Sequence, residues 1–151
     1  DSLSVGENVA FALREHTTLS EAEIAARVRE VLDLVGLGAI EAMDPTDLSG
    51  GMKKRVAVAR AVALPPSVLL YDEPTTGLDP TNVEKITDLI LELKTKLGVT
   101  SVVVTHDMPS ALKVSDRVAM LHQGSIAAVG TPAEIQRTHD SLIRDFMEGR
   151  V

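Results

Sequence analysis

Cysteine is absent from this chain and aromatic residues are scarce: its 151 residues include no Trp, one Tyr and two Phe. Without cysteine the chain can form no disulfide and no thiolate metal site, which fits a reducing compartment. The core must therefore be built from aliphatic side chains, and these are plentiful, since hydrophobic residues make up 44% of the chain. The length corresponds to one domain, or to a large part of one.

Long apolar runs and an excess of basic charge are also missing. No run approaches the roughly 20 apolar residues that a bilayer-spanning helix needs. The net charge of −7 argues against a nucleic-acid partner, because such binding relies on Lys and Arg to neutralise phosphates. The one dense basic cluster, Lys53 to Arg55, is typical of a solvated helix face. Because the chain begins at Asp1 rather than at Met, we expect it to be a piece of a longer protein.

The first part of the chain contains signals for helices. Capping boxes of the form Ser-x-x-Glu begin at Ser4 and Ser20, and each precedes apolar residues at helical spacing. A third helix should begin at Ser49 and stop before the two prolines at 65 and 66. These signals predict a helical subdomain over residues 1–64.

After the prolines, strand patterns alternate with helix patterns. Residues 68–71 and 102–104 are short apolar runs, which predict strands buried on both faces of a parallel sheet. A helix between them should end near Gly98, and the apolar runs on either side of Gly124 predict an antiparallel hairpin. Residues 65–151 are therefore expected to form a partial α/β core, with a mostly parallel sheet flanked by helices and two short helices at the C-terminal end.

Two acidic residues, Asp72 and Glu73, directly follow the first predicted strand. The carboxyl end of a buried parallel strand is where open α/β sheets bind their ligands. An Asp at such a position can hold Mg²⁺ beside the phosphates of a nucleotide, and an adjacent Glu can accept a proton from an attacking water. Apolar residues followed by Asp-Glu also occur at strand ends with no such role, so both interpretations stay open for this motif alone.

The start of the third predicted helix is the second candidate site. Ser49 is placed to cap the helix, and Gly50 and Gly51 follow it. Several backbone N–H groups are then free at the positive end of the helix dipole, and the glycines allow a phosphate to approach the backbone closely. An ordinary capped helix start is the alternative for this motif taken alone.

Taken together, the motifs resemble those of the ATP-binding domain of ABC transporters. They occur in a fixed order along the chain as Leu48-Ser49-Gly50-Gly51-Met52, Asp72-Glu73, Gly77-Leu78-Asp79 and Thr105-His106-Asp107. The first is similar to the family's signature motif, with Met in place of the commoner Gln. The others are similar to Walker B with its catalytic glutamate, to the D-loop and to the switch histidine. The resemblance covers essentially the whole chain and implies the C-terminal part of a P-loop ABC ATPase fold.

The resemblance implies one set of residues that serves the subunit's own nucleotide. Asp72 would hold Mg²⁺ and Glu73 would be the catalytic base. His106 would act beside that base as the switch histidine. ATP and Mg²⁺ are thus the implied cofactors.

A second set would serve a partner, because ATP-binding domains of this family pair head to tail. Ser49 and Gly51, with Gly50 between them, would contact the γ-phosphate of an ATP that is held mainly by the second subunit. Asp79 would connect the two nucleotide sites.

The family's phosphate-cradling loop is missing from the sequence. None of the ten glycines is followed by Lys, so no Walker A motif of the form G-x-x-x-x-G-K-[ST] is present. In the family this loop precedes the segment at which the chain begins. We therefore expect this chain alone to bind ATP poorly and not to hydrolyse it.

Within the family, the sequence is most similar to the Mla-type ATPases of MCE-linked lipid transport. The more specific shared features are Met52 and the basic run that follows it. The similarity implies an ATPase subunit that energises phospholipid or other lipid transport from the cytoplasmic face of the inner membrane. Its partners would be permease subunits and an MCE-domain lipid-binding protein. An ATPase for a polar solute such as an amino acid, and a catalytically inactive interaction module, remain alternatives.

The opening segment gives one further expectation. Leu3, Val5 and Phe11 are too many apolar residues for one small core to bury from so short a helix, so some of them should line a surface groove that receives a permease helix. The alternative is that they pack against Val28 and Val31 of the next helix.

Overall fold

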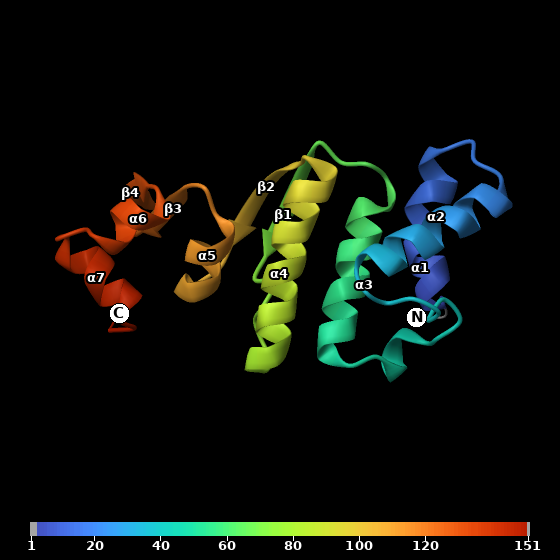
Figure 1. The fold of residues 1–151 in the computed structure, drawn as a ribbon, viewed down its shortest axis with the longest axis horizontal. Coiled ribbons are helices and arrows are strands. Elements are labelled where there is room, and N and C mark those ends of the chain that lie inside the picture. The colour runs from blue at the N-terminus through green and yellow to red at the C-terminus, as the bar shows by residue number, and fades with distance from the viewer. Residues whose placement is uncertain (1–2, 151) are drawn as a thin grey trace.

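The computed structural model describes residues 3–150, whose elements follow one another along an elongated molecule (Figure 1). The helices are α1 (Val5–His16), α2 (Glu21–Leu34), the 3-10 turn η1 (Pro45–Asp47), α3 (Gly50–Ala63), α4 (Pro80–Leu97), α5 (Met108–Val114), α6 (Pro132–Gln136) and α7 (Ser141–Met147). The strands are β1 (Val68–Asp72), β2 (Thr100–Val104), β3 (Val118–His122) and β4 (Ser125–Gly130). Within residues 3–150, no helix is both long and apolar enough to cross a bilayer.

The predicted helix boundaries are confirmed where a cap defines them. Ser4 and Ser20 both form complete capping boxes, each with the Glu three residues later, at the starts of α1 and α2. Ser49 caps α3, which ends at Ala63 before the two prolines. Gly98 ends α4 in the left-handed conformation, with φ +61°, which glycine adopts without steric cost. All these signals are local in sequence, so they operate regardless of the tertiary surroundings.

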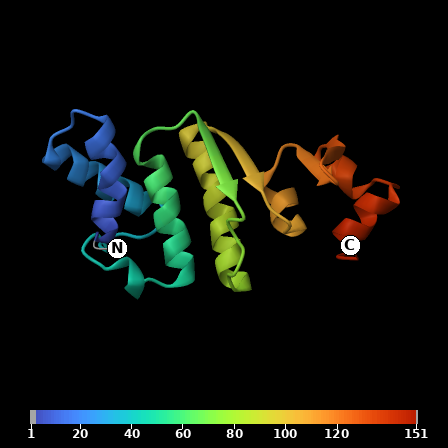
Figure 2. The ribbon, with the colours of Figure 1, turned by 180° about the vertical axis from the view of Figure 1, so that it is seen from behind.

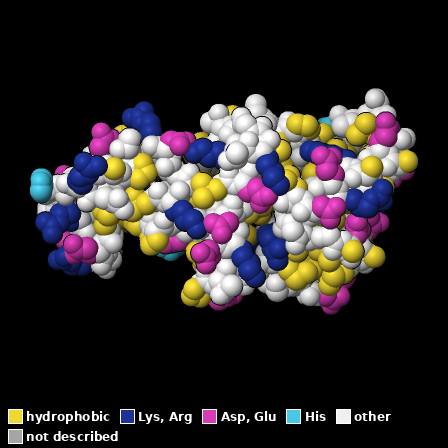
Figure 3. Space-filling model, viewed as in Figure 1, with side chains coloured by type: hydrophobic (Ala, Val, Ile, Leu, Met, Phe, Trp, Pro, Cys, Tyr) yellow, Lys and Arg dark blue, Asp and Glu magenta, His cyan; other side chains and the backbone are white. Residues whose placement is uncertain are grey.

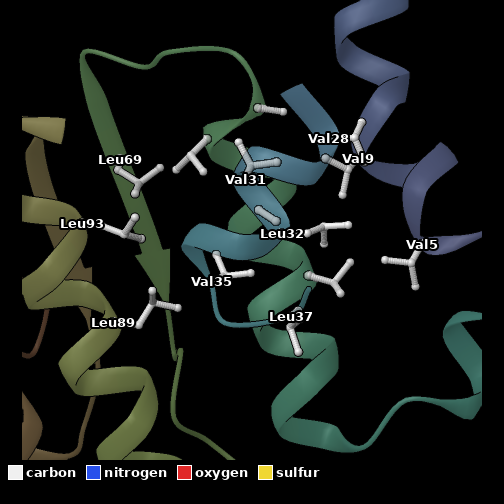
Figure 4. Packing of buried hydrophobic residues seen from close by; sticks show 14 of the residues in the cluster. Val5, Val9, Val28, Val31, Leu32, Val35, Leu37, Leu69, Leu89 and Leu93 are labelled. Carbon is white, nitrogen blue, oxygen red and sulfur yellow. The ribbon is translucent and has the colours of Figure 1, made fainter. Parts of the chain in front are cut away.

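The core of the molecule is one aliphatic cluster that runs from α1 to the β1–β2 sheet. Figure 4 shows side chains of α1, α2, β1 and α4 that belong to it, including Val9, Val31, Leu69 and Leu93. Three of these four are fully buried and Leu69 is 4% exposed. Burying one such side chain contributes about 1.5–3 kcal/mol. The cluster spans both sides of residue 64, and the division into units at 1–64 and 65–151 stays a prediction.

The sheet formed by β1 and β2 is parallel, as predicted, with Val68 beside Thr100 and Asp72 beside Val104. The expectation that both strands are buried on both faces is wrong. In β1, Leu69 and Tyr71 face the core, whereas Leu70 is 73% exposed, and in β2 Val104 is 58% exposed.

The exposure has a simple geometric cause. Successive side chains of a strand point to opposite faces of the sheet, and α4 lies over one face while the strands stand in front of it in the view from behind (Figure 2). Along residues 3–150, no element covers the outward side chains Val68, Leu70, Val102 and Val104. Apolar residues on both faces of β1 and β2 are typical of strands that are covered on both sides. Among the described residues, only one face of the two strands is covered.

The predicted hairpin is confirmed in β3 and β4, which pair antiparallel. Gln123 and Gly124 form the two-residue turn, and both have positive φ, at +46° and +77°. That combination matches the twist of the flanking strands. The hairpin packs on α6 and α7 through a small second cluster of Met120, Ile135 and Ile143.

Surface charge contributes little to holding these elements together. Lys94 pairs with Asp116 at 2.6 Å and Lys113 with Asp88 at 2.8 Å, which ties α4 to the segment around α5. Figure 3 shows acidic and basic side chains interspersed over the face seen in Figure 1. Exposed pairs of this kind contribute about 0.2–1 kcal/mol, so the aliphatic core dominates the stability.

The opening apolar residues divide into two groups. Val5 is fully buried in the same cluster as Val28 and Val31, so the expectation of a groove residue is wrong for Val5. Leu3 and Phe11 remain outside, 40% and 56% exposed. Val5 lies at the first turn of α1 on its core-facing side, and its backbone N–H also donates to the Met43 carbonyl at 2.9 Å.

We therefore expect Val5→Asp to destabilise the fold by about 3 kcal/mol or more, because it buries an unpaired carboxylate. Phe11→Asp on the same helix is the matched control, since Phe11 is exposed and its replacement should change the free energy of unfolding by less than about 1 kcal/mol. Urea unfolding followed by circular dichroism measures both values. Equal stability of the two variants would contradict the placement of Val5.

Candidate functional site

The backbone at the end of β1 places the two acidic residues of the candidate site. Asp72 is the last residue of β1 and is exposed, on the same side of the strand as Leu70. The chain then turns at Glu73, which has φ +45°, and the Glu73 N–H donates to the carbonyl of Val104 at 2.9 Å. A non-glycine residue in this conformation costs roughly 1–3 kcal/mol and persists only where its surroundings hold it. The strained residue is the predicted catalytic base.

The Glu73 carboxylate lies beside His106, which follows β2 in the chain. Nδ1 of His106 is 2.9 Å from Oε1 of Glu73, and the His106 backbone N–H donates to the same oxygen at 3.2 Å. The hydroxyl of Thr76 donates to the other oxygen, Oε2, at 2.7 Å. Because the ends of parallel strands meet at one edge of a sheet, residues 33 positions apart in sequence become neighbours.

The contact shifts the protonation equilibria of both groups in opposite directions. The hydrogen bond from His106, followed by that from Thr76, holds the pKa of Glu73 below its ordinary value of 4.5. The hydrogen bond to Glu73 and its negative charge raise the pKa of His106 above 6.5. The stabilisation from Glu73 is present above pH 4.5 and is lost as the pH falls through its lowered pKa. The stabilisation from His106 is present below pH 6.5 and is lost as the pH rises through its raised pKa. The ion pair between Glu73 and His106 is therefore strongest between pH 4.5 and pH 6.5.

The start of α3 presents the candidate phosphate-contacting residues. Ser49 and Gly50 are exposed, and the Ser49 hydroxyl accepts from the Met52 N–H at 3.3 Å. Gly51 is buried, and a Cβ at this position would lie 2.8 Å from Oδ1 of Asn82. A larger residue at position 51 would therefore have to displace the Asn82 side chain of α4, a constraint that the sequence did not reveal. Gly50 is looser, since a Cβ there would make an ordinary contact of 3.6 Å with Leu78.

Asp79 caps the helix that Gly51 touches. Its Oδ1 accepts from the Asn82 backbone N–H at 3.1 Å and its Oδ2 from the Asn82 side-chain amide at 2.5 Å. These two hydrogen bonds, the side-chain one first, lower the pKa of Asp79. Asn82 thus contacts both Asp79 and Gly51, and it brings these two predicted site residues to one place.

Sequence reasoning missed the contributions of Asn82 and of the basic run after the signature motif. Only Lys53 of that run is exposed, so the expected solvated face is wrong for the other two residues. The Lys54 ammonium donates to the Glu73 carbonyl at 3.0 Å, and Arg55 donates to the Gly36 carbonyl at 3.0 Å. Helical periodicity could have shown that Lys53 and Lys54 face different directions. It could not have shown which carbonyl Lys54 reaches.

We expect Glu73→Ala to move the pKa of His106 down toward 6.5, because the variant removes both the hydrogen bond and the charge that raise it. A titration of the imidazole resonances by NMR measures this pKa. Glu41→Ala, which removes a carboxylate in the distant segment beside Gly6, is the control and should leave the pKa of His106 unchanged. An unchanged value in Glu73→Ala would show that the two side chains do not pair in solution.

Comparison with known proteins gives consistent matches. A family model described as ABC transporter matches residues 2–76. The chain is 41% identical over 147 residues to the intermembrane phospholipid transport system ATP-binding protein MlaF of Escherichia coli (strain K12), covering 97% of this chain and 55% of that protein. It is 45% identical over 147 residues to the Fe(3+) ions import ATP-binding protein FbpC 2 of Rhizobium meliloti (strain 1021), with 97% and 37% covered. It is also 41% identical over 150 residues to the probable ribonucleotide transport ATP-binding protein mkl of Mycobacterium tuberculosis (strain ATCC 25618 / H37Rv), with 99% and 42% covered.

The fold agrees with these matches. The structure of cbiO1 from Clostridium perfringens, described as part of the ABC transporter complex cbiONQ, superposes with a TM-score of 0.81 at 33% identity, over 100% of this chain and 62% of that one. This chain spans about half the length, or less, of the curated relatives named above. The family model, the sequence relatives and the fold agree with the order of the motifs: this chain belongs to the ABC-transporter family of ATP-binding domains.

Proposed function

We propose that this chain is the part of an ABC-transporter ATPase subunit that supplies the hydrolytic residues of its own nucleotide site and the signature residues of its partner's. The observation that carries the proposal is the pairing of Glu73 with His106 at the carboxyl end of β1. A carboxylate without a function at a strand end needs neither a strained backbone nor a histidine that follows another strand to hold it. Both features are expected of a base that must be aimed at one water molecule.

ATP with Mg²⁺ is the proposed cofactor, and the residues fit it. Mg²⁺ in nucleotide sites is bound by one or two carboxylates together with the nucleotide's phosphates, and Asp72 is an exposed carboxylate at the strand end. When bound, the metal would neutralise charge that develops on the phosphates. Asp72 would hold it beside Glu73 in the sequence and in space.

Glu73 would accept the proton of the attacking water. The hydrogen bonds that lower the pKa of Glu73 keep its carboxylate ionised, which is the form that accepts a proton. Oε1 is shared with His106 and Oε2 with Thr76, so both oxygens are oriented before any substrate arrives. The raised pKa of His106 increases its positively charged fraction, which favours a neighbouring phosphate.

The signature residues would act across a head-to-tail dimer. The hydroxyl of Ser49 and the free N–H groups at the start of α3 present hydrogen-bond donors at an exposed helix N-terminus. Asp79 lies against the same part of α3 through Asn82. We propose that this combined surface contacts the nucleotide of the second ATPase subunit and links the two sites.

Lipid transport is the proposed physiological role, with permease subunits and an MCE-domain protein as partners. The similarity to MlaF and the Met52 variant of the signature support it. The higher identity to an iron importer favours a polar or ionic solute as the second candidate. Subunits of this kind would lie on the cytoplasmic face of the inner membrane, bound to their permease. Neighbouring genes that encode an MCE-domain protein and a permease would support the lipid role, and genes for a periplasmic solute-binding protein would contradict it.

The permease contact is proposed for the N-terminal helices. Val5 is excluded because it is fully buried and does not line the groove between α1 and α2, whereas Phe11 of α1 is 56% exposed. A groove between α1 and α2 is lined by Ala10, Ile24 and Val28 and rimmed by charged side chains. Leu3, Val5 and Phe11, the residues first expected to line a groove, do not line the groove between α1 and α2.

Glu73→Gln in the full-length ATPase should retain ATP binding and lower turnover by about 10²–10⁴-fold, because the amide keeps the shape of the side chain but accepts no proton. Turnover is measured by phosphate release and binding by equilibrium dialysis. Glu84→Gln, which neutralises an exposed carboxylate of α4, is the control and should hydrolyse ATP normally. Near-normal turnover by Glu73→Gln would contradict the assignment of the base.

Ser49→Arg should block ATP-driven dimerisation of the full-length protein, because the large side chain would occupy the position of the partner's γ-phosphate. Gel filtration with ATP, in a Glu73→Gln background that prevents turnover, measures the dimer. Ser20→Arg is the matched control: it removes the same kind of helix cap, worth about 0.5–2 kcal/mol, from α2 instead of α3. An unchanged dimer peak with Ser49→Arg would contradict the proposed interface.

A further inference from the structure

Lys54 connects the signature helix to the catalytic residue by a direct contact. Its ammonium donates to the backbone carbonyl of Glu73 at 3.0 Å across 19 positions of sequence. The preceding residue, Lys53, is exposed, whereas Lys54 is half-buried. Two adjacent lysines of the same helix therefore have different surroundings, and only one reaches the site.

The carbonyl that Lys54 holds belongs to the strained residue of the site. Glu73 has φ +45°, and its N–H is bound to the Val104 carbonyl at 2.9 Å. Its carbonyl accepts from Lys54, and at a longer 3.4 Å from the Thr76 N–H. A hydrogen bond from a charged donor is roughly twice as strong as a neutral one. Lys54 is thus the strongest single contact on the backbone that aims the Glu73 side chain.

Lys54 does not contact the Glu73 carboxylate. Its oxygens are bound to His106 and Thr76, whereas the ammonium reaches the carbonyl. Lys54 therefore acts on the position of Glu73 and not by pairing with its charge.

The same helix carries the signature residues. Ser49 caps α3 and Lys54 lies five residues later on it, a distance of about 7–8 Å along the helix axis. A helix of 14 residues that is packed into the core moves as one body. Any displacement of its N-terminus by a nucleotide at Ser49 is therefore carried to the Glu73 carbonyl.

We propose that Lys54 is a positioning residue that couples the two nucleotide sites of the dimer, so that ATP bound at the signature end of α3 adjusts the catalytic Glu73 of the other site. This inference rests on the proposed ATPase function. Through Lys54, the signature helix of one subunit senses the partner's nucleotide and sets the geometry of its own subunit's base. The partner's ATP thus promotes hydrolysis at both sites.

The test compares Lys54→Met with Lys53→Met and Lys54→Arg in the full-length ATPase, with ATP binding, kcat and the Hill coefficient of hydrolysis measured for each. Lys54→Met should lower kcat by about 10–100-fold, as small misplacements of reacting groups do. It should also lower the Hill coefficient from above about 1 toward about 1, the value for independent sites. ATP binding should change less than twofold, since Lys54 touches no proposed ATP contact. Lys53→Met should match the wild type, and Lys54→Arg, which can donate to the same carbonyl, should restore cooperativity.

Several results would overturn the inference. A wild-type Hill coefficient of about 1 leaves no coupling to transmit. If Lys54→Met lowers kcat but keeps the wild-type Hill coefficient, Lys54 supports only its own site and does not couple the two sites. If Lys53→Met and Lys54→Met have equal kcat and Hill coefficients, the contact of Lys54 with Glu73 has no special role. If Lys54→Met does not fold, Lys54→Gln, whose side chain is shorter and uncharged, replaces it and must still show the lower Hill coefficient. Glu73→Gln in the same assay separates the two claims, because its normal turnover would refute the ATPase mechanism itself.

Discussion

Leu69 and Tyr71 of β1 point into the aliphatic core beneath α4, and the pleat of a strand then turns the residues between and after them outward. Asp72, the last residue of β1, is exposed for this reason. The next residue cannot continue the strand, and it reverses into the left-handed region, where Val104 and Lys54 hold its backbone. The burial of Leu69 and Tyr71 therefore determines the positions of the Asp72 and Glu73 carboxylates.

The helix α3 connects three aspects of the structure. Its buried face, which includes Val56 and Val62, closes the core between the N-terminal helices and the sheet. Its first turn presents Ser49 at the surface and packs Gly51 against Asn82 of α4. Its second turn places the Lys54 ammonium at the Glu73 carbonyl, just after the end of β1. Because a helix is stiff and its core face is close-packed, these functions cannot shift independently of one another.

The sequence predicted the elements well where the signal is local and failed where a second element decides. Capping boxes at Ser4 and Ser20 formed as expected, because a cap needs only residues three positions apart. Val5 was expected near a groove and is fully buried, since the partner helix that covers it cannot be read from α1 alone. The strands were expected to be buried on both faces, yet Leu70 is 73% exposed, because burial depends on what lies over a strand and not on its composition.

By itself, the sequence determined the family, the order of the motifs and the identity of the candidate catalytic residues, because residue types at set spacings along one chain carry that information. Only the tertiary structure decided that Glu73 meets His106 across 33 positions and that Lys54 holds the Glu73 carbonyl. Such contacts join segments whose separation in space is set by how α3, α4 and the β1–β2 sheet pack. A hydrogen bond depends on distances of a few tenths of an ångström, and packing of the whole core fixes those distances.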